Sequence, residues 1–403
     1  MRRADATLLA EGPCVLKNLP EISDVNICFH ILKEMGADIQ VLSRTSVRID
    51  TSSVKDPTVP YELAKRMRAS YYFLGALLSR FGYANVAMPG GCNFGVRPIN
   101  LHLKGFKSLG AEYDIDGGMI KVRSDSLIGT HIYFDVVSVG ATINLILASV
   151  KAKGLTIIEN AAKEPHIVDL ANFLNSIGAD IMGAGTDVIK IRGVENFGTT
   201  DYSIIPDQIE AGTYMAMAAA TGGDVIIKNV IPKHLESIIY KMRAMDIDIE
   251  EFDDSVRVSA PRPFKKINVT TQPHPGFPTD MQPQITALLT LAEGASIVTE
   301  AIWDIRFKYV DELRRMGANI SVDGKVAVVE GNGRLKGAPV AATDLRAGAA
   351  MIIAALAAEG QTEIENIEYI ERGYGRILEK LQALGADIRR IEIPEHEPFK
   401  QAL

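Results

Sequence analysis

The stretch that decides the fold is residues 138–191, SVGATINLILASVKAKGLTIIENAAKEPHIVDLANFLNSIGADIMGAGTDVIKI. Small and apolar residues over Val139–Lys153 predict a helix that runs, through one glycine, into an apolar strand over Leu155–Asn160. A second helix is predicted for Pro165–Ser176, and Ile181–Ile191 has the alternation of a β-hairpin. Helices that alternate with strands in this way predict an α/β fold.

The same unit recurs six times, with a period of about 70 residues. One recurring mark is a helix that ends in Gly-Ala, with one degenerate copy, at Gly36, Gly110, Gly178, Asp246, Gly317 and Gly385. The other is a small-residue helix that stops at a glycine before a strand, at Gly12, Gly82, Gly154, Gly222, Gly294 and Gly360. Because two independent marks share one period, we infer six copies of one folding unit.

Helices such as Ala349–Ala358 are apolar nearly all round, which is typical of a buried helix. We therefore expect two inside-out, barrel-like α/β domains with helices inside and sheets outside. Three units each give domains at 1–205 and 206–392, with a boundary near Tyr202–Pro206 and a frayed tail at 393–403. The alternative is one continuous solenoid, which we favour less because solenoid repeats are usually shorter and need capping units.

The composition is that of a soluble globular protein, with 47% apolar and 23% charged residues among 403. A net charge of −7 argues against a nucleic acid or an anionic membrane as partner of the whole surface. Three cysteines are too few for a disulfide framework and suit a reducing compartment. With no apolar run of about 18 residues and no signal-peptide core, we expect a cytoplasmic protein, by default a monomer.

Several arginines and carboxylates stand near predicted helix starts in corresponding parts of the repeats. Arginine forks bind carboxylate and phosphate at two points, so such a set suits a small polyanionic substrate. The alternative is that each arginine pairs with a neighbouring surface carboxylate. The candidates are Arg68, Asp280, Arg306, Asp344, Arg346 and Arg372.

The segment Pro89–Pro98, PGGCNFGVRP, places Cys92 among three glycines, with Arg97 five residues on. A nearby guanidinium favours the thiolate, so this cysteine is a candidate reactive or proton-donating group. The alternative is an incidental cysteine. The segment is not a phosphate-binding P-loop, because the Lys-Ser/Thr pair is absent.

Taken together, the ordered motifs resemble the UDP-N-acetylglucosamine 1-carboxyvinyltransferase family of enolpyruvyl transferases. The resemblance runs from about Leu8 to Ile391, and the related shikimate-pathway synthase lacks the cysteine loop and the SVGAT helix start. It rests on Met67–Ser70, Pro89–Cys92, Arg97-Pro98, Ser138–Thr142, Ile158–Ala162, Phe277–Met281, Ala342–Ala347 and Arg372–Tyr374.

The resemblance implies that phosphoenolpyruvate adds to the 3′-hydroxyl of UDP-N-acetylglucosamine and that phosphate leaves, in the first committed step of peptidoglycan synthesis. It implies that Asp280 accepts the hydroxyl proton and that Cys92 donates a proton to C3 of phosphoenolpyruvate. It implies phosphoenolpyruvate binding by Arg97, Arg346 and Arg372, with support from Glu164, Arg306 and Asp344. It implies a UDP-sugar site made of Arg68, Arg97, Pro98, Ile99, Asn100, Leu101, Ser138, Val139, Gly140, Asp280 and Ile302. It implies no metal and no cofactor.

The sequence departs from the family pattern at several places. The family's phosphoenolpyruvate-contacting Lys-Asn pair precedes the first small-residue helix and has no counterpart here. Single residues differ at Asn100, His166, Gln208 and Glu371. These departures leave open a transferase with another acceptor, or a weak or inactive binding or regulatory paralogue. The repeat phase also predicts that the gene starts upstream of Met1. If that upstream segment is absent from the protein, we expect the second domain to lack one strand.

Overall fold

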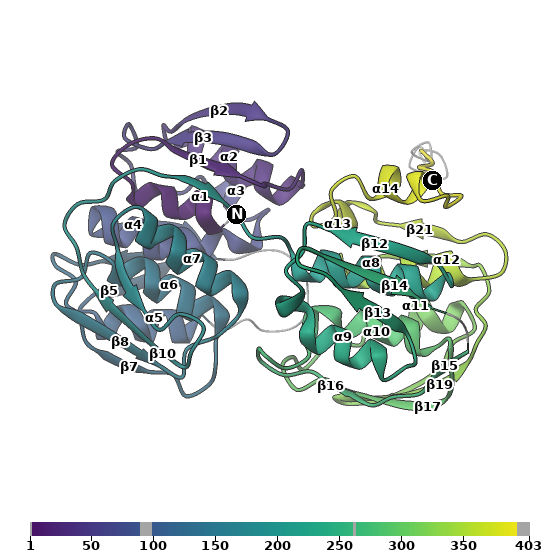
Figure 1. The fold of residues 1–403 in the computed structure, drawn as a ribbon. Helices are drawn as coiled ribbons and strands as arrows, with labels where there is room; N and C mark the ends of the chain where they lie inside the picture. The colour runs from purple at the N-terminus through teal and green to yellow at the C-terminus, as the bar shows by residue number, and fades with distance from the viewer. Residues whose placement is uncertain (1, 89–98, 261–262, 393–403) are drawn as a thin grey trace, which may run out of the picture.

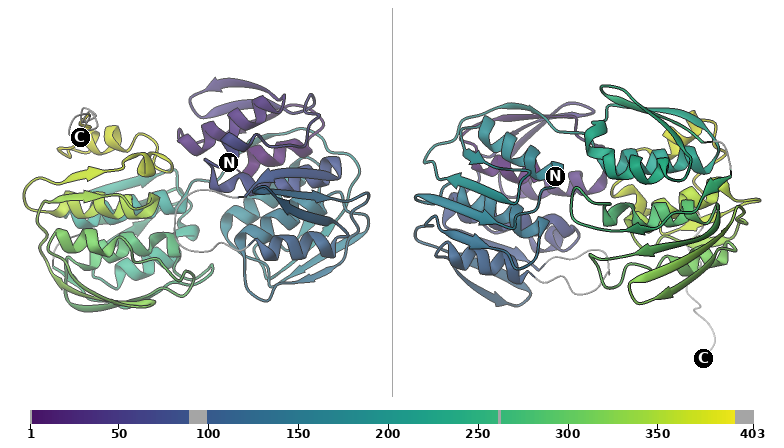
Figure 2. Two further views of the ribbon diagram at one scale, coloured as in Figure 1. Left: turned by 180° about the vertical axis from the view of Figure 1, so that it is seen from behind. Right: turned by 60° about the horizontal axis from the view of Figure 1, so that its bottom comes forward.

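The computed structural model describes residues 2–88, 99–260 and 263–392 (Figure 1). The apolar side chains form two separate cores, one built from residues between Ala4 and Phe197 and one from residues between Ile209 and Leu381. Tyr202 and Ile204 pack against the first core, and Ile209 belongs to the second. Figures 1 and 2 show two bodies side by side, each with helices inside and sheets around them.

The third unit has the element order predicted from its sequence. Helix α6 (Val139–Ser149) leads into strand β8 (Leu155–Glu159), and α7 (Pro165–Ser176) precedes the hairpin of β9 (Asp180–Met182) and β10 (Val188–Arg192). Helix α6 is four residues shorter than predicted. The backbone of Lys153 bonds instead to Leu127 O at 2.8 Å and accepts from Gly129 N at 2.8 Å, so this segment leaves the helix to pair with a neighbouring loop.

The helices of the first domain form its interior. Every residue of α6 from Ala141 onward is buried, as expected for a helix that is apolar all round. Helix α4 approaches α6 closely at Gly75, whose N–H donates to Asn144 Oδ1 at 2.9 Å. The helices are α1 (Arg2–Ala6), η1 (Thr7–Leu9), α2 (Ser23–Glu34), α3 (Tyr61–Ala64), η2 (Arg68–Tyr72), α4 (Phe73–Phe81), α5 (Asn100–Ser108), α6 and α7.

Three sheets surround these helices, in the orders β11-β1-β3-β2, β4-β6-β5 and β7-β8-β10-β9. In the third sheet, β7 runs parallel to β8, and β10 pairs antiparallel with both β8 and β9. The strands are β1 (Cys14–Lys17), β2 (Asp38–Ser43), β3 (Ser46–Asp50), β4 (Tyr83–Ala87), β5 (Glu112–Asp116), β6 (Met119–Arg123), β7 (His131–Tyr133), β8, β9, β10 and β11 (Asp201–Ser203).

The second domain repeats this plan around α8 (Gln208–Ala220), α10 (Gln282–Leu289) and α12 (Leu345–Ala357). Its other helices are η3 (Pro232–Leu235), α9 (Glu236–Arg243), η4 (Thr279–Met281), α11 (Val310–Arg315), α13 (Glu368–Glu371) and α14 (Ile377–Ala383). Its strands are β12 (Asp224–Lys228), β13 (Asp248–Glu251), β14 (Ser255–Ser259), β15 (Phe264–Lys265), β16 (Val269–Thr270), β17 (Ala292–Thr299), β18 (Asn319–Asp323), β19 (Val326–Asn332), β20 (Pro339–Ala341) and β21 (Glu363–Glu365).

The sheets remain separate, so the described residues form no closed barrel. The sixth sheet differs from the others because, within the described ranges, it contains only β20 and β21. None of the helices in the described ranges is long and apolar enough to cross a membrane. The tail 393–403, expected to fray, lies outside the described residues.

Candidate active site

Asp280 lies in the short helix η4, directly before the buried helix α10. Its side chain is 47% exposed, and its carboxylate faces two arginines. Arg346 approaches Oδ2 with Nη2 at 3.2 Å and Nε at 3.3 Å, and Nη2 of Arg306 lies 3.6 Å from Oδ1. Two positive charges thus lie beside this carboxylate. The structure thus brings together three residues that are distant in the sequence.

Arg346 is held in place by the start of α12. Asp344 caps this helix, because its Oδ1 accepts from the backbone N–H of Arg346 at 2.8 Å and of Ala347 at 3.1 Å. Such a cap satisfies donors that have no partner within the helix. Asp344 therefore acts on the site by fixing the helix turn that carries Arg346.

A buried tyrosine holds the other side of Arg346. Nη1 of Arg346 donates to the hydroxyl of Tyr374 at 3.1 Å, and this hydroxyl also lies 3.0 Å from Thr213 Oγ1 and 3.3 Å from Gln284 Nε2. Burial raises the pKa of Tyr374, so the phenol stays protonated. The guanidinium is consequently fixed between the Asp280 carboxylate and a polar network contributed by helices α8 and α10 and the turn after α13.

A second buried carboxylate organises the neighbouring loop. Glu300 is fully buried and accepts from Thr271 Oγ1 and Thr279 Oγ1, each at 2.9 Å. It also accepts from the backbone N–H of Ile302 at 2.9 Å and of Trp303 at 3.1 Å. One side chain thereby ties the loop that contains Ile302 to the segment that precedes Asp280.

Arg372 pairs with a carboxylate of the first domain. Its guanidinium forms a fork with Asp24 of the first domain, with Nε to Oδ1 at 2.9 Å and Nη2 to Oδ2 at 3.2 Å. Both side chains are 17% exposed. Arg372, which was predicted to bind phosphoenolpyruvate, thus lies at a contact between the two domains.

In the first domain, two helix starts carry the predicted UDP-sugar residues. Ser138 caps α6 by accepting from Ala141 N at 3.3 Å, and Val139 and Gly140 form the first turn. A Cβ on Gly140 would lie 2.8 Å from Nε2 of His102 and 3.0 Å from the hydroxyl of Tyr71, so only glycine fits. The other helix start carries Ile99, the N-cap of α5, and the first two residues of that helix, Asn100 and Leu101.

His102 lies under this turn and is buried. Burial lowers its pKa to about 4, so the imidazole is neutral near pH 7. Tyr71 packs against it edge-on, with ring centroids 5.2 Å apart. A neutral aromatic layer therefore supports the backbone of residues 138–140.

Comparison with known proteins places the chain in a family. A model of the family EPSP synthase (3-phosphoshikimate 1-carboxyvinyltransferase) matches residues 5–381. UDP-N-acetylglucosamine 1-carboxyvinyltransferase 3 of Caldanaerobacter subterraneus is 57% identical over 386 residues, which cover 96% of this chain and 92% of that protein. UDP-N-acetylglucosamine 1-carboxyvinyltransferase 2 of Clostridium acetobutylicum is 56% identical, with 96% and 93% covered. The chain belongs to the UDP-N-acetylglucosamine 1-carboxyvinyltransferase family.

The fold is that of the enolpyruvyl transferases. The enolpyruvyl transferase NikO from Streptomyces tendae superposes with a TM-score of 0.88 at 26% identity, covering 96% of this chain and 92% of that one. EPSP synthase from Acinetobacter baumannii superposes with a TM-score of 0.72 at 19% identity, covering 92% and 90%. The second likeness concerns the fold alone.

Several residues expected from the family resemblance are placed less fully. Cys92, Arg97 and Pro98 lie outside the described residues, and Arg68 begins η2. Glu164 precedes α7 as its N-cap, and its Oε2 is buried without a hydrogen-bond partner among the described residues. All four residues that differ from the family pattern lie at helix ends: Asn100 at the start of α5, His166 in the first turn of α7, Gln208 at the start of α8 and Glu371 at the end of α13.

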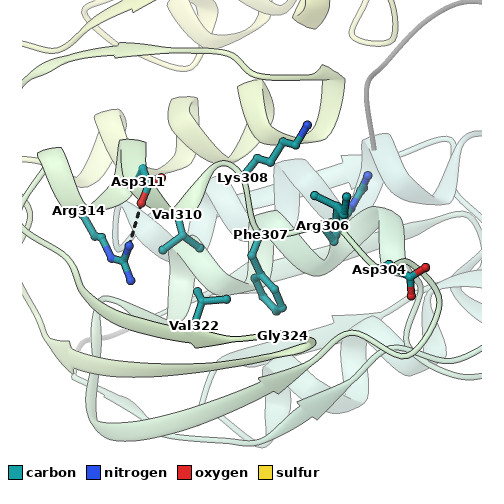
Figure 3. A pocket seen from close by; sticks show the side chains of 10 residues that line it. Asp304, Arg306, Phe307, Lys308, Val310, Asp311, Arg314, Val322 and Gly324 are labelled. Atoms are coloured by element: carbon teal, nitrogen blue, oxygen red, sulfur yellow. Dashed lines mark hydrogen bonds and ion pairs between the residues drawn. The ribbon is translucent and has the colours of Figure 1, made fainter. Parts of the chain in front are cut away.

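A cavity of about 280 Å³, lined by both charged and apolar side chains, adjoins this transferase site through Arg306 (Figure 3). Its charged groups are paired, Arg314 with Asp311 at 2.8 Å and Asp304 with Lys325 at 2.7 Å. Among the residues that the structure describes, no group of three or more His, Cys, Asp or Glu is arranged to hold a metal ion. The cavity is therefore assigned no ligand.

Sequence reasoning missed Glu300, the role of Tyr374, and Asp24. Tyr374 belongs to the motif Arg372–Tyr374, so the sequence marked its position, but the sequence does not show which residues its hydroxyl contacts. Glu300 follows directly on the apolar strand β17, and a carboxylate at a strand end beside a functional loop is the available signal. Asp24 is an ordinary first-turn residue of α2, and nothing local distinguishes it.

Proposed function

We propose that this chain transfers the enolpyruvyl group of phosphoenolpyruvate to the 3′-hydroxyl of UDP-N-acetylglucosamine and releases phosphate, the first committed step of peptidoglycan synthesis. The observation that carries the proposal is the half-exposed Asp280 carboxylate held by Arg346 and Arg306. This arrangement combines a proton acceptor open to solvent with fixed positive charge. Curated relatives with this named activity are 50–57% identical over nearly the whole chain.

The reaction needs one bond made and one broken. The sugar hydroxyl oxygen attacks C2 of phosphoenolpyruvate and gives its proton to Asp280, while C3 gains a proton, for which Cys92 is the proposed donor. The tetrahedral adduct then loses phosphate from C2 and a proton from C3, which restores the vinyl group. Arg346 and Arg306 stabilise the negative charge of the carboxylate and phosphate throughout.

The two domains contribute complementary halves of the site in this proposal. The second domain supplies Asp280 with its arginines, and Glu300 fixes the loop of Ile302 close to them. The first domain supplies the helix starts at Ser138 and Asn100, and a helix N-terminus suits a diphosphate. We also propose that the domains divide near residue 205, and that Arg68, Arg97, Pro98 and Glu164 complete the site.

We infer a cytoplasmic, monomeric enzyme that needs no cofactor and serves cell-wall synthesis. In support, the UDP-sugar and phosphoenolpyruvate are charged and membrane-impermeant substrates. Cys14 and Cys28 are buried free thiols, which suits a reducing compartment. Addition–elimination moves protons and phosphate only and can be carried by side chains.

Phosphate release from phosphoenolpyruvate and UDP-N-acetylglucosamine tests the role of Asp280. Asp280→Asn removes the proton acceptor but keeps the shape, so kcat should fall by about 10²- to 10⁴-fold while UDP-sugar binding stays within about threefold. Asp224→Asn is the matched control, because Asp224 is 51% exposed and is bound by Arg257 at 2.7 Å on the outer surface. Equal kcat in the two variants would contradict the proposed role.

A further inference from the structure

The fork between Asp24 and Arg372 joins residues 348 positions apart and crosses from one domain to the other. It has two hydrogen bonds, at 2.9 and 3.2 Å, and both side chains are only 17% exposed. A two-point arginine–carboxylate pair with this much shielding is better ordered than a surface ion pair. The pair therefore fixes the relative position of two segments.

Other contacts show that these two segments meet closely. A Cβ on Gly375 would lie 2.9 Å from the backbone oxygen of Glu21, so the turn after α13 packs against the start of α2 with no room for a side chain. Asn229 Nδ2 donates to Asn18 Oδ1 at 3.2 Å, again between the domains. The Asp24 fork is thus one part of a defined interface.

The same turn leads directly to the catalytic cluster. Arg372 is two residues before Tyr374, whose hydroxyl receives the hydrogen bond from Arg346 at 3.1 Å. Between them, a Cβ on Gly373 would lie 2.8 Å from Leu345, the first residue of α12. Because the turn is packed so tightly on α12, a displacement of Arg372 cannot leave the position of Arg346 unchanged.

The position of Asp24 in helix α2 favours its role as the residue that holds Arg372 in place. It lies in the first turn of the 12-residue helix α2, where the helix dipole favours a negative charge. Neighbouring charges on the same interface are engaged elsewhere, since Glu21 binds Arg44 at 2.9 and 3.0 Å. Glu21 Oε2 lies 4.0 Å from Arg376, which makes it a weaker contact between the domains.

We propose that Asp24 is a positioning residue of the transferase. Its carboxylate latches the two domains together through Arg372 and holds Arg372 and the Tyr374–Arg346 pair in the geometry that receives phosphoenolpyruvate. The effect on substrate rests on the proposed function, whereas the latch itself is a property of the protein without substrate. The two are tested separately.

The kinetic test compares Asp24→Asn, Asp24→Glu and the matched control Glu21→Gln in the phosphate-release assay. Asp24→Asn should raise the KM for phosphoenolpyruvate about tenfold and leave the KM for the UDP-sugar within about threefold. Asp24→Glu should restore much of the loss, and Glu21→Gln should change either KM less than about twofold. In an Arg372→Lys background, Asp24→Asn should raise the KM for phosphoenolpyruvate by less than about a further twofold, because Asp24 acts through that arginine.

Small-angle X-ray scattering of the substrate-free proteins tests the latch without any turnover. Asp24→Asn should increase the radius of gyration relative to the wild type and Glu21→Gln. A wild type that releases no phosphate while Asp24→Asn still expands would refute the proposed function and support the latch. An unchanged KM for phosphoenolpyruvate together with an unchanged radius of gyration in Asp24→Asn would overturn the inference.

Discussion

At the scale of single residues, the structure brings together the charged residues predicted from the sequence. The side chains that hold them in place were not predicted. Asp280, Arg306 and Arg346 were chosen from their motifs, and the structure places both guanidinium groups within 3.6 Å of the Asp280 carboxylate. Tyr374 and Glu300 could not be assigned because their partners are distant in the sequence. A hydrogen-bond network of this kind depends on tertiary contacts that no local pattern encodes.

Tyr374→Phe tests how Arg346 is positioned. Loss of the hydroxyl removes the acceptor of Arg346 Nη1 and the partner of Thr213. We expect a loss of about 1–2 kcal/mol in the free energy of unfolding, since buried donors are left without a partner. The KM for phosphoenolpyruvate should also rise about fivefold. Urea denaturation and steady-state kinetics measure both effects. Tyr240→Phe, at a side chain 72% exposed, should change neither.

His102 should make the protein sensitive to acid. Its pKa is about 4 in the folded chain and 6.5 when unperturbed, so the unfolded chain takes up the proton first. This contribution to stability is complete above pH 6.5 and is lost as the pH falls toward 4, on the order of 3 kcal/mol. Between pH 7 and pH 4, the Tm of His102→Gln should fall less steeply with pH than the Tm of the wild type. The exposed-site variant His131→Gln should keep the wild-type slope, and a shallow slope in both would refute this assignment.

At the scale of elements, the sequence predicted the type and order of the helices and strands more reliably than their ends. The pattern of α7 gave both bounds, Pro165 and Ser176. Helix α6 ended four residues early, because Lys153 forms backbone hydrogen bonds to Leu127 and Gly129 in a neighbouring loop. Such competition between helix and neighbouring loop is decided by the tertiary structure.

The contact between helices α4 and α6 depends on Gly75. A Cβ there would lie 2.4 Å from the backbone oxygen of Asn144 and 3.0 Å from Cβ of Leu147, so the helices would have to separate. Gly75→Ala should lower the free energy of unfolding by about 1–3 kcal/mol, measured by urea denaturation. Gly198→Ala is the control, because its nearest contact would be an ordinary 3.6 Å. Equal stability of the two variants would argue against close helix packing in this core.

At the scale of the whole molecule, the period of about 70 residues predicted six copies of one unit, and the helices that are apolar nearly all round predicted the inside-out plan. The sixth unit has a sheet of only two strands, β20 and β21, within the described residues. Ala386–Ile391 has the same pattern as the strands that follow Gly-Ala in other units, yet it forms no strand in the described chain. A strand needs a neighbour, and the sixth sheet supplies only β20 and β21.

The central claim is that the two domains together transfer enolpyruvate to a UDP-sugar. The most direct measurement is mass spectrometry of the products after incubation with phosphoenolpyruvate and either UDP-N-acetylglucosamine or 3-phosphoshikimate, with released phosphate counted in parallel. We expect the enolpyruvyl ether of the UDP-sugar, one phosphate for each product molecule, and no product from 3-phosphoshikimate. Product from 3-phosphoshikimate alone, or phosphate release without any enolpyruvyl product, would contradict it.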